Sequence, residues 1–258
     1  MEIVFLGTGT SQGVPIIGCN CDVCKSNDPH DKRLRSSVLV KIDDVTIVID
    51  TGPDFRTQFL REGIEQLDAV FITHPHRDHL AGLDDIRAFN FIYKKQMPVY
   101  GNSNTCKQIR YEFFYSFTTP RYPGVPDIDL HEIVDTSKPF YIKGVEVMPI
   151  NVLHYKMEVL GFKIGGFSYI TDASYISDVE LEKIKGAKIL VINALRQKEP
   201  HLAHFILPQA LEIIEKTSPR VAYLTHVSHS MGFYSDVENL LPKNVHLAYD
   251  GLKLKIEN

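Results

Sequence analysis

The sequence predicts an α/β fold in which two β-sheets pack face to face between layers of helices. Runs of apolar, β-branched residues fall into two batches of comparable size, and helical patterns are interspersed among them. At 258 residues and 44% hydrophobic content, the chain is long enough to bury the core that such a fold needs. We expect one domain over residues 1–258, because no long linker or internal repeat divides the chain.

Composition narrows the range of partners and compartments. A net charge of −4 gives no electrostatic argument for binding to nucleic acid or to an anionic membrane. The sequence has no apolar run long enough to span a bilayer, and its first residues lack the basic region of a signal peptide. Four cysteines, three of them clustered, do not form the pattern of a secreted disulfide framework. We therefore expect a cytoplasmic protein without a membrane partner.

The first predicted strand, residues 2–6, ends in a glycine-rich turn, Gly7-Thr8-Gly9-Thr10-Ser11-Gln12-Gly13. Its glycine spacing is GxGxxxG, and no helical pattern follows. A dinucleotide-binding fingerprint requires a helix start at this point to hold the pyrophosphate. The turn is therefore not predicted to bind a dinucleotide.

A CxCxxC cluster follows, made of Cys19, Cys21 and Cys24. Three thiolates at this spacing can bind one zinc ion from a single loop and leave a fourth position for a distant ligand. A redox pair at Cys21 and Cys24 is the alternative, but we see no helix start that would lower a thiol pKa. We predict structural zinc here, and we expect Cys106, in a helical pattern, to be a buried apolar residue.

The next segment is predicted to form a hairpin and a helix. Residues 37–42 and 45–49 are β-branched runs joined by a short acidic turn. The second run ends in Asp50, which could orient a metal-bound histidine or simply form a turn, and both readings stay open. Residues 55–62 read as a helix that Gly63 ends. Before the hairpin, Arg33 and Arg35 suit a solvated basic loop better than a phosphate clamp.

The most informative stretch is His74-Pro75-His76-Arg77-Asp78-His79. It follows a buried strand at residues 67–72 and precedes a helical pattern over residues 80–89. His74 and His76 are two residues apart, so on an extended segment they share a face. Imidazole and carboxylate groups suit zinc, manganese or iron. We therefore predict a site for two metal ions side by side rather than a polar loop that happens to contain histidines.

Three further strands deliver a His or an Asp at their carboxyl ends. His154 follows the strand at residues 145–152, Asp172 follows a hairpin over residues 161–170, and His226 follows residues 220–224. Two metals need about eight ligand contacts, which seven side chains can supply if one carboxylate bridges. The candidate ligands are His74, His76, Asp78, His79, His154, Asp172 and His226.

The remaining segments are less specific. A strand at residues 188–192 precedes a loop with His201 and His204, then a helix at residues 208–216. A final pair of strands is expected at residues 245–248 and 252–256. Residues 89–126 hold most of the aromatic side chains, and these could belong to a core helix, a lid over the site or a dimer contact.

Taken together, these motifs resemble the metallo-β-lactamase superfamily in its dinuclear phosphodiesterase branch. The Gly7-Thr8-Gly9 turn, the cysteine cluster and Thr225-His226-Val227-Ser228-His229 are similar to the PhnP-type phosphoribosyl cyclic phosphate phosphodiesterases. The resemblance runs over residues 1–251 and implies a four-layer αβ/βα sandwich that is often a homodimer. The segment with the extra aromatic residues departs from it.

The resemblance also implies roles for individual residues. One metal, Mn²⁺ or Zn²⁺, would be held by His74, His76, His154 and Asp172, and a second by Asp78, His79, Asp172 and His226. Structural Zn²⁺ would be held by Cys19, Cys21, Cys24 and His229. His204 matches the family's active-site histidine that binds no metal, whereas His201 lies outside the matching position. The catalytic residues implied are therefore His204 and Asp78.

The activity implied is hydrolysis of a small phosphodiester, cyclic ones included, by a hydroxide that bridges two divalent metals. The metals would neutralise the non-bridging oxygens, and His204 would protonate the leaving alkoxide. Three alternatives remain: a pyrroloquinoline quinone pathway protein, a ribonuclease Z-like nuclease, and a metal-stabilised binding protein without turnover. The nuclease is disfavoured because a tight hairpin fills the chain between His154 and Asp172, where its substrate-gripping arm is usually placed.

Overall fold

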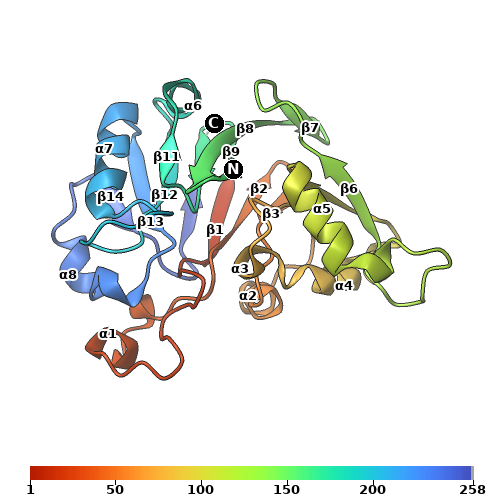
Figure 1. Ribbon diagram of the computed structural model, residues 1–258, viewed down its shortest axis with the longest axis horizontal. Helices are drawn as coiled ribbons and strands as arrows, with labels where there is room; N and C mark the ends of the chain where they lie inside the picture. The colour runs from red at the N-terminus through yellow and green to blue at the C-terminus, as the bar shows by residue number, and fades with distance from the viewer. Residues whose placement is uncertain (257–258) are drawn as a thin grey trace.

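The computed structural model describes residues 1–256 and arranges them in four layers. Two β-sheets face each other in the middle, and helices lie on the outer side of each (Figure 1). The strand order is β15-β1-β2-β3-β4-β5-β6 in the first sheet and β11-β8-β9-β10-β12-β13-β14 in the second, where β7 also pairs with β8. This arrangement confirms the predicted αβ/βα sandwich.

The elements have the following bounds. The first sheet is built from β1 (Glu2–Gly7), β2 (Ser37–Ile42), β3 (Val45–Ile49), β4 (Ala69–Phe71), β5 (Met97–Gly101), β6 (Ile128–Glu132) and β15 (Lys253–Lys255). The second is built from β7 (Phe140–Ile142), β8 (Val145–His154), β9 (Met157–Ile164), β10 (Phe167–Ile170), β11 (Tyr175–Ile176), β12 (Ile189–Asn193), β13 (Val221–Thr225) and β14 (Val245–Leu247). The main helices are α2 (Phe55–Glu62), α4 (Arg87–Tyr93), α5 (Ser103–Glu112), α6 (Asp178–Ile184), α7 (Leu207–Thr217) and α8 (Tyr234–Glu238).

Side chains alternate between the two faces of each strand, and this alternation produces the layers. On β1, Ile3 and Phe5 point into the core between the two sheets, whereas Val4 and Leu6 pack under the helices of the first sheet. This is the period of two that a strand buried on both faces requires. The second sheet repeats the arrangement, because α6 and α7 cover its outer face. Both sheets are therefore buried on two sides and can hold a site only at their edges.

The parallel strands place that site at one edge. β3 pairs in parallel with β4, and β10 pairs in parallel with β12, which pairs in parallel with β13. The carboxyl ends of parallel strands meet at the same edge of a sheet, where ligands bind in open α/β sheets. The loops that leave β4, β10 and β13 therefore start close together.

The two strands predicted near the end of the chain both form, and they lie in different sheets. β14 lies beside β13 in the second sheet, and β15 lies beside β1 in the first. The chain therefore crosses between the sheets after β14, and β15 pairs antiparallel with the edge of β1.

The helical pattern at residues 80–89 is also interrupted, which corrects the prediction. It is divided into α3 (Arg77–Leu80), a 3₁₀ turn η2 (Leu83–Ile86) and α4. The cause is Gly82, whose N–H donates to the carbonyl of Thr51 at 2.8 Å. A Cβ on Gly82 would lie 2.1 Å from the carbonyl oxygen of Gly52, so only glycine allows this approach. The break packs α3 against the loop after β3.

The aromatic segment divides into two groups. Phe89 and Phe113 are buried under the first sheet, as a core explanation predicts. Other aromatic side chains there are exposed, namely Phe91, Tyr93, Tyr111, Phe114 and Tyr122. For these, the lid and the dimer contact stay predictions.

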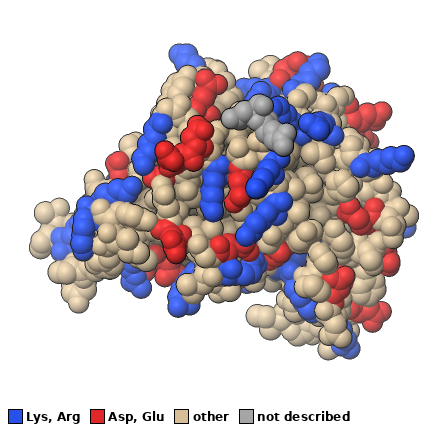
Figure 2. All heavy atoms as spheres, turned by 180° about the vertical axis from the view of Figure 1, so that it is seen from behind, with Lys and Arg blue, Asp and Glu red and all other residues tan. Residues whose placement is uncertain are grey.

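The charge on the surface and the hydrophobicity of the helices concern two kinds of partner, nucleic acid and membrane. The face seen in Figure 2 mixes Lys and Arg with Asp and Glu, so residues 1–256 present no unbroken positive surface there. Within the same residues, none of the helices has the length and apolar character that crossing a membrane requires.

We predict that Gly82→Ala lowers the free energy of unfolding by about 3 kcal/mol, because the new methyl group collides with backbone that cannot move aside. Chemical denaturation measures the effect. Gly186→Ala is the control: it has φ +66° and open space around it, so it should cost about 1 kcal/mol through backbone conformation alone. Equal losses in the two variants would contradict the account of Gly82.

Candidate metal centre

Four strand ends converge on one point at the edge of the two sheets. His74 and His76 follow β4, His154 ends β8, Asp172 follows β10, and His226 follows β13. Their ligand atoms form two adjoining groups, in each of which all atoms lie within 4.8 Å of one another. The groups are His74, His76 and His154, and Asp78, His79, Asp172 and His226. The structure therefore brings together all seven predicted side chains.

The first group is rich in imidazole. His74 Nε2 lies 3.0 Å from His76 Nδ1 and 4.0 Å from Asp172 Oδ1. Burial, followed by the nearby His79, lowers the pKa of His74 well below its usual value. A neutral imidazole with a free lone pair is the form that binds a metal.

The second group concentrates negative charge around one histidine. His79 Nε2 lies 3.0 Å from Asp78 Oδ2 and 3.2 Å from Asp172 Oδ2, yet it is buried and makes no hydrogen bond. Burial works against charge on His79, but the carboxylates, Asp78 first, outweigh it and raise the pKa of His79 well above its usual value. An unpaired buried nitrogen facing two carboxylates fits a cation lying between them.

Asp172 connects the two groups. Its Oδ2 lies 3.2 Å from both His79 Nε2 and His226 Nδ1, and its Oδ1 faces His74. Burial disfavours ionisation of Asp172, but the imidazoles, His226 first, hold its pKa well below the usual range. One carboxylate with an oxygen toward each group can serve two cations at once.

Asp50 lies behind His79 and orients it. Its Oδ2 accepts a hydrogen bond from His79 Nδ1 at 2.7 Å, while its Oδ1 accepts from the Thr73 N–H at 2.8 Å. This leaves Nε2 of His79 directed at the centre, so of the two readings of Asp50 the orienting one agrees with the structure. Thr73, which was not predicted to belong to the site, also places its hydroxyl 2.9 Å from His74 Nδ1. Its position directly before His74 was the available signal.

Backbone strain coincides with the site. Asp50, Asp172 and His226 have φ values of 68°, 53° and 56°, in the left-handed region that residues with a side chain seldom adopt. Each lies one or two residues after the end of a strand. The chain turns sharply there to aim the side chain inward, and such strain is typical of functional sites.

The loop after β12 brings a further histidine to the centre. His204 Nε2 lies 2.9 Å from Asp172 Oδ1, and His154 Nδ1 lies 2.7 Å from the carbonyl of Ala203. His201 instead contacts His204, with its Nδ1 3.1 Å from His204 Nδ1. His204 therefore reaches the centre, and His201 lies one contact further out.

The cysteine cluster forms a second candidate site, with His229 as the distant ligand. The sulfurs of Cys19, Cys21 and Cys24 lie 3.4, 3.3 and 3.5 Å from His229 Nδ1. One N–H cannot donate to three sulfurs, whereas a tetrahedral zinc site places sulfur and nitrogen about 3.6 Å apart. The four side chains therefore fit a zinc ion.

A helix does start at the cysteine cluster, which contradicts the expectation from sequence. A short helix, α1 (Asp22–Lys25), begins directly after Cys21, and the Cys21 sulfur accepts from the N–H of Cys24. This helix has only 4 residues, which is too short for a helical pattern to be recognised in the sequence. The convergence of a third thiol and His229 now carries the zinc reading instead.

Neither reading of Arg33 was right. Its side chain is buried, and its Nη1 donates to Thr8 Oγ1 at 2.8 Å and to the carbonyl of Ala248 at 2.5 Å. It therefore joins the first loop to the end of the chain. Arg35 pairs with Asp54 at 3.3 Å and is partly exposed.

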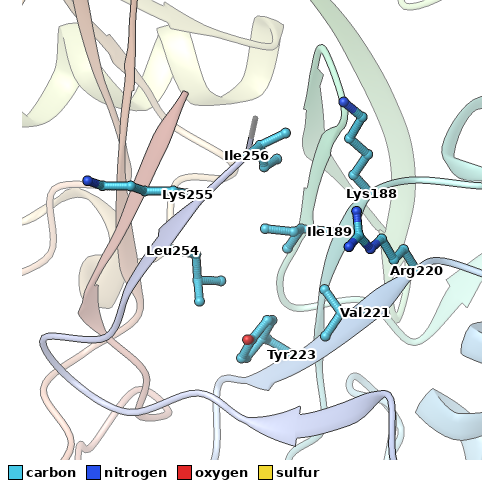
Figure 3. A pocket seen from close by; sticks show the side chains of 8 residues that line it. All are labelled: Lys188, Ile189, Arg220, Val221, Tyr223, Leu254, Lys255 and Ile256. Carbon is cyan, nitrogen blue, oxygen red and sulfur yellow. The ribbon is translucent and has the colours of Figure 1, made fainter. Parts of the chain in front are cut away.

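A separate hollow of about 390 Å³ lies between the sheets near the end of the described chain (Figure 3). Apolar side chains from both sheets line it, together with Lys188, Arg220 and Lys255. None of its lining residues is a His, Cys, Asp or Glu. The hollow is therefore distinct from both candidate metal sites.

Comparison with known proteins defines the class. Residues 45–227 match the family model of the beta-lactamase superfamily domain. A solved structure described as a new diphosphatase from the PhnP family has a TM-score of 0.91 and 40% identity, covering 98% of this chain and 96% of that chain. The chain therefore belongs to the β-lactamase superfamily. Within it the chain is PhnP-like, and both findings support a hydrolase.

The curated relatives bear other names. An octanoyltransferase of Porphyromonas gingivalis is 39% identical over all of this chain but only 52% of the relative. A ribonuclease Z of Methanococcus maripaludis is 25% identical over 72% of this chain and 53% of the relative. Coenzyme PQQ synthesis protein B of Methylorubrum populi is 34% identical over 34% of each chain. The chain thus spans about half, or less, of the length of these relatives.

We predict that Asp50→Asn weakens metal binding at the centre roughly 10- to 100-fold, because His79 loses the carboxylate that fixes its orientation. Competition with a chromophoric chelator measures the affinity. Zinc held by the cysteine cluster should be retained and serves as the internal control. Unchanged affinity at the centre would show that Asp50 is only a turn residue.

Cys21→Ser is expected to lower the melting temperature, because binding free energy at a structural zinc site contributes to folding. Differential scanning calorimetry measures the shift, with Cys106→Ser, a buried cysteine of α5 remote from the cluster, as a comparison for thiol loss alone. If Cys21→Ser has the same melting temperature as the wild-type protein, the cluster does not hold a structural ion.

Proposed function

We propose that this chain is a metal-dependent phosphodiesterase that hydrolyses a small phosphodiester, cyclic ones included, at a centre for two divalent cations. The observation that carries the proposal is the position of Asp172, whose two oxygens face two groups of ligand-type side chains. The donor set of imidazoles and carboxylates suits Zn²⁺ or Mn²⁺. His74, His76, His154 and Asp172 would hold one cation, and Asp78, His79, Asp172 and His226 the other.

Two cations supply activation of water and neutralisation of the anionic phosphate oxygens. The chain's own groups do the rest. Asp50 keeps the ring of His79 directed inward, and the carbonyl of Ala203 does the same for His154. His204, outside the two ligand sets, is placed to give a proton to the leaving oxygen, because its Nε2 reaches the centre, 2.9 Å from Asp172 Oδ1.

A diphosphate is the second candidate substrate. The PhnP-family neighbour that is 40% identical is described as a diphosphatase. A diphosphate ester, like a phosphodiester, has an electrophilic phosphorus with anionic oxygens, so the same cations and the same His204 would serve both. The two proposals differ in the leaving group, an alkoxide in one and a phosphate in the other.

The alternatives have less support. β9, its turn and β10 use up the chain between His154 and Asp172, which leaves no room there for the arm of a ribonuclease Z. The octanoyltransferase name belongs to a relative of which this chain spans half. Two alternatives remain predictions: a role in the pyrroloquinoline quinone pathway, and a binding role without turnover. The strained turns at Asp172 and His226 argue against the binding role, because such strain is typical of functional sites.

A side-by-side assay tests the proposal with cyclic ribose phosphates, cyclic nucleotides, linear phosphodiesters, diphosphate esters and precursor tRNA. Turnover of a small phosphodiester is the expected result. Cleavage of diphosphate esters alone would move the assignment to the second candidate, and cleavage of precursor tRNA alone would contradict both.

Asp172→Ala is expected to abolish hydrolysis of an aryl phosphodiester while the cysteine cluster keeps its zinc, because Asp172 would be the ligand common to both cation sites. Rate and metal content are measured on the same sample. Asp178→Ala, on the exposed start of α6, is a matched carboxylate control and should keep the wild-type rate. Retained activity in Asp172→Ala would show that the bridging role is wrong.

His204→Ala should slow hydrolysis of an alkyl phosphodiester more than that of a p-nitrophenyl ester, by roughly 100-fold against a few-fold. An alkoxide needs a proton to leave, whereas p-nitrophenolate leaves without one. Comparison of kcat for the two substrates measures the difference. An equal loss for both would show that His204 is not the proton donor.

A further inference from the structure

The loop that carries His204 is fastened at its base to the segment that carries His229. The N–H and the hydroxyl of Ser228 donate to the carbonyl of Leu195 at 3.0 and 2.7 Å. Further along the loop, Gln197 Nε2 donates to the carbonyl of Met231 at 2.6 Å. These contacts join residues 195–197 to the turn beside the cysteine cluster.

The other end of the same loop is fastened to the metal centre. The Phe205 N–H donates to the carbonyl of Ala173 at 2.7 Å, next to Asp172, and the Leu195 N–H donates to the carbonyl of Phe205 at 2.9 Å. His204 itself contacts Asp172. The loop is therefore held between the two candidate metal sites, with Gln197 on one side and His204 on the other.

The segment from His226 to Met231 connects those two sites directly. His226 belongs to the centre, and His229, three residues later, belongs to the cysteine cluster. Between them, Val227 forms a bridge with Gly9, and its N–H donates to the carbonyl of Thr8 at 2.9 Å. A short segment fixed at both ends and in the middle is a rigid base for the loop.

The neighbourhood of Gln197 is shaped for this contact. Gly232 has φ +101°, and a Cβ there would lie 3.1 Å from Gln197 Nε2. A side chain at position 232 would therefore crowd the amide. Gln197 also lines the hollow beside Cys21 and His229.

We propose that Gln197 is a positioning residue, through which the cysteine–histidine site sets the place of His204 at the metal centre. Its role in turnover rests on the proposed function. Loss of the bond unties the outer half of the loop from the cysteine–histidine site and leaves it held by Arg196, which donates to the carbonyls of Glu199 and Pro200. A displacement of about 1 Å at a reacting group can cost up to 100-fold in rate. The cysteine site then contributes to the reaction through geometry as well as to stability.

The test compares the wild-type holoenzyme with Gln197→Ala and Gln197→Glu. The second keeps the size of the side chain but has no N–H to donate at pH 8. Lys198→Ala is the matched control, since Lys198 is the next residue, is exposed and makes no side-chain bond within residues 1–256. Metal content, kcat and KM for an aryl phosphodiester, and hydrogen exchange of residues 198–206 are measured for each.

Both Gln197 variants should keep the wild-type metal content, exchange several-fold faster over residues 198–206, and lose about tenfold in kcat with little change in KM. Cys21→Ser should speed exchange in the same residues, and Lys198→Ala should match the wild type. Exchange in the Gln197 variants that equals that of Lys198→Ala would overturn the proposal, as would faster exchange with an unchanged kcat. If the wild type turns over no substrate, the proposed function fails, and the exchange data alone decide whether Gln197 fixes the loop.

Discussion

The structure depends on one buried carboxylate. Asp172 is almost entirely enclosed and lies within 4 Å of four imidazoles from three separate segments, namely His74 and His79, His204, and His226. A buried charge is costly unless opposite charges or hydrogen bonds compensate it, so this arrangement is stable only if the segments meet at the same point. The strained turns at Asp172 and His226 and the hydrogen bonds that orient His79 and His154 serve that requirement.

The four-layer architecture meets the requirement because parallel strands end together. β4 in one sheet and β10 and β13 in the other all point toward the same edge, so short loops suffice to bring their side chains into contact. Arg33 and the crossing of the chain from β14 to β15 then tie the first loop to the last. The cysteine cluster brings the first loop against His229, in the segment after β13, at a second point.

Much of the site could be predicted because its signals are local. A His or Asp directly after an apolar strand is visible in the sequence, and HPHRDH places four ligand-type groups within six residues. The features that the sequence did not predict depend on contacts between distant segments. The break at Gly82 comes from a carbonyl thirty residues earlier in the chain, the burial of Arg33 from an acceptor near the end of the chain, and the fastening of the His204 loop from Gln197 and Met231. The hydrophobic periodicity of a sequence gives no information about such contacts.

Anomalous X-ray diffraction from crystals of the purified protein, recorded on both sides of the zinc and manganese absorption edges, tests the central claim most directly. Two anomalous peaks are expected beside the Asp172 carboxylate, and a third is expected among Cys19, Cys21, Cys24 and His229. A single peak at the centre, or density in which Asp172 contacts no ion, would contradict the claim.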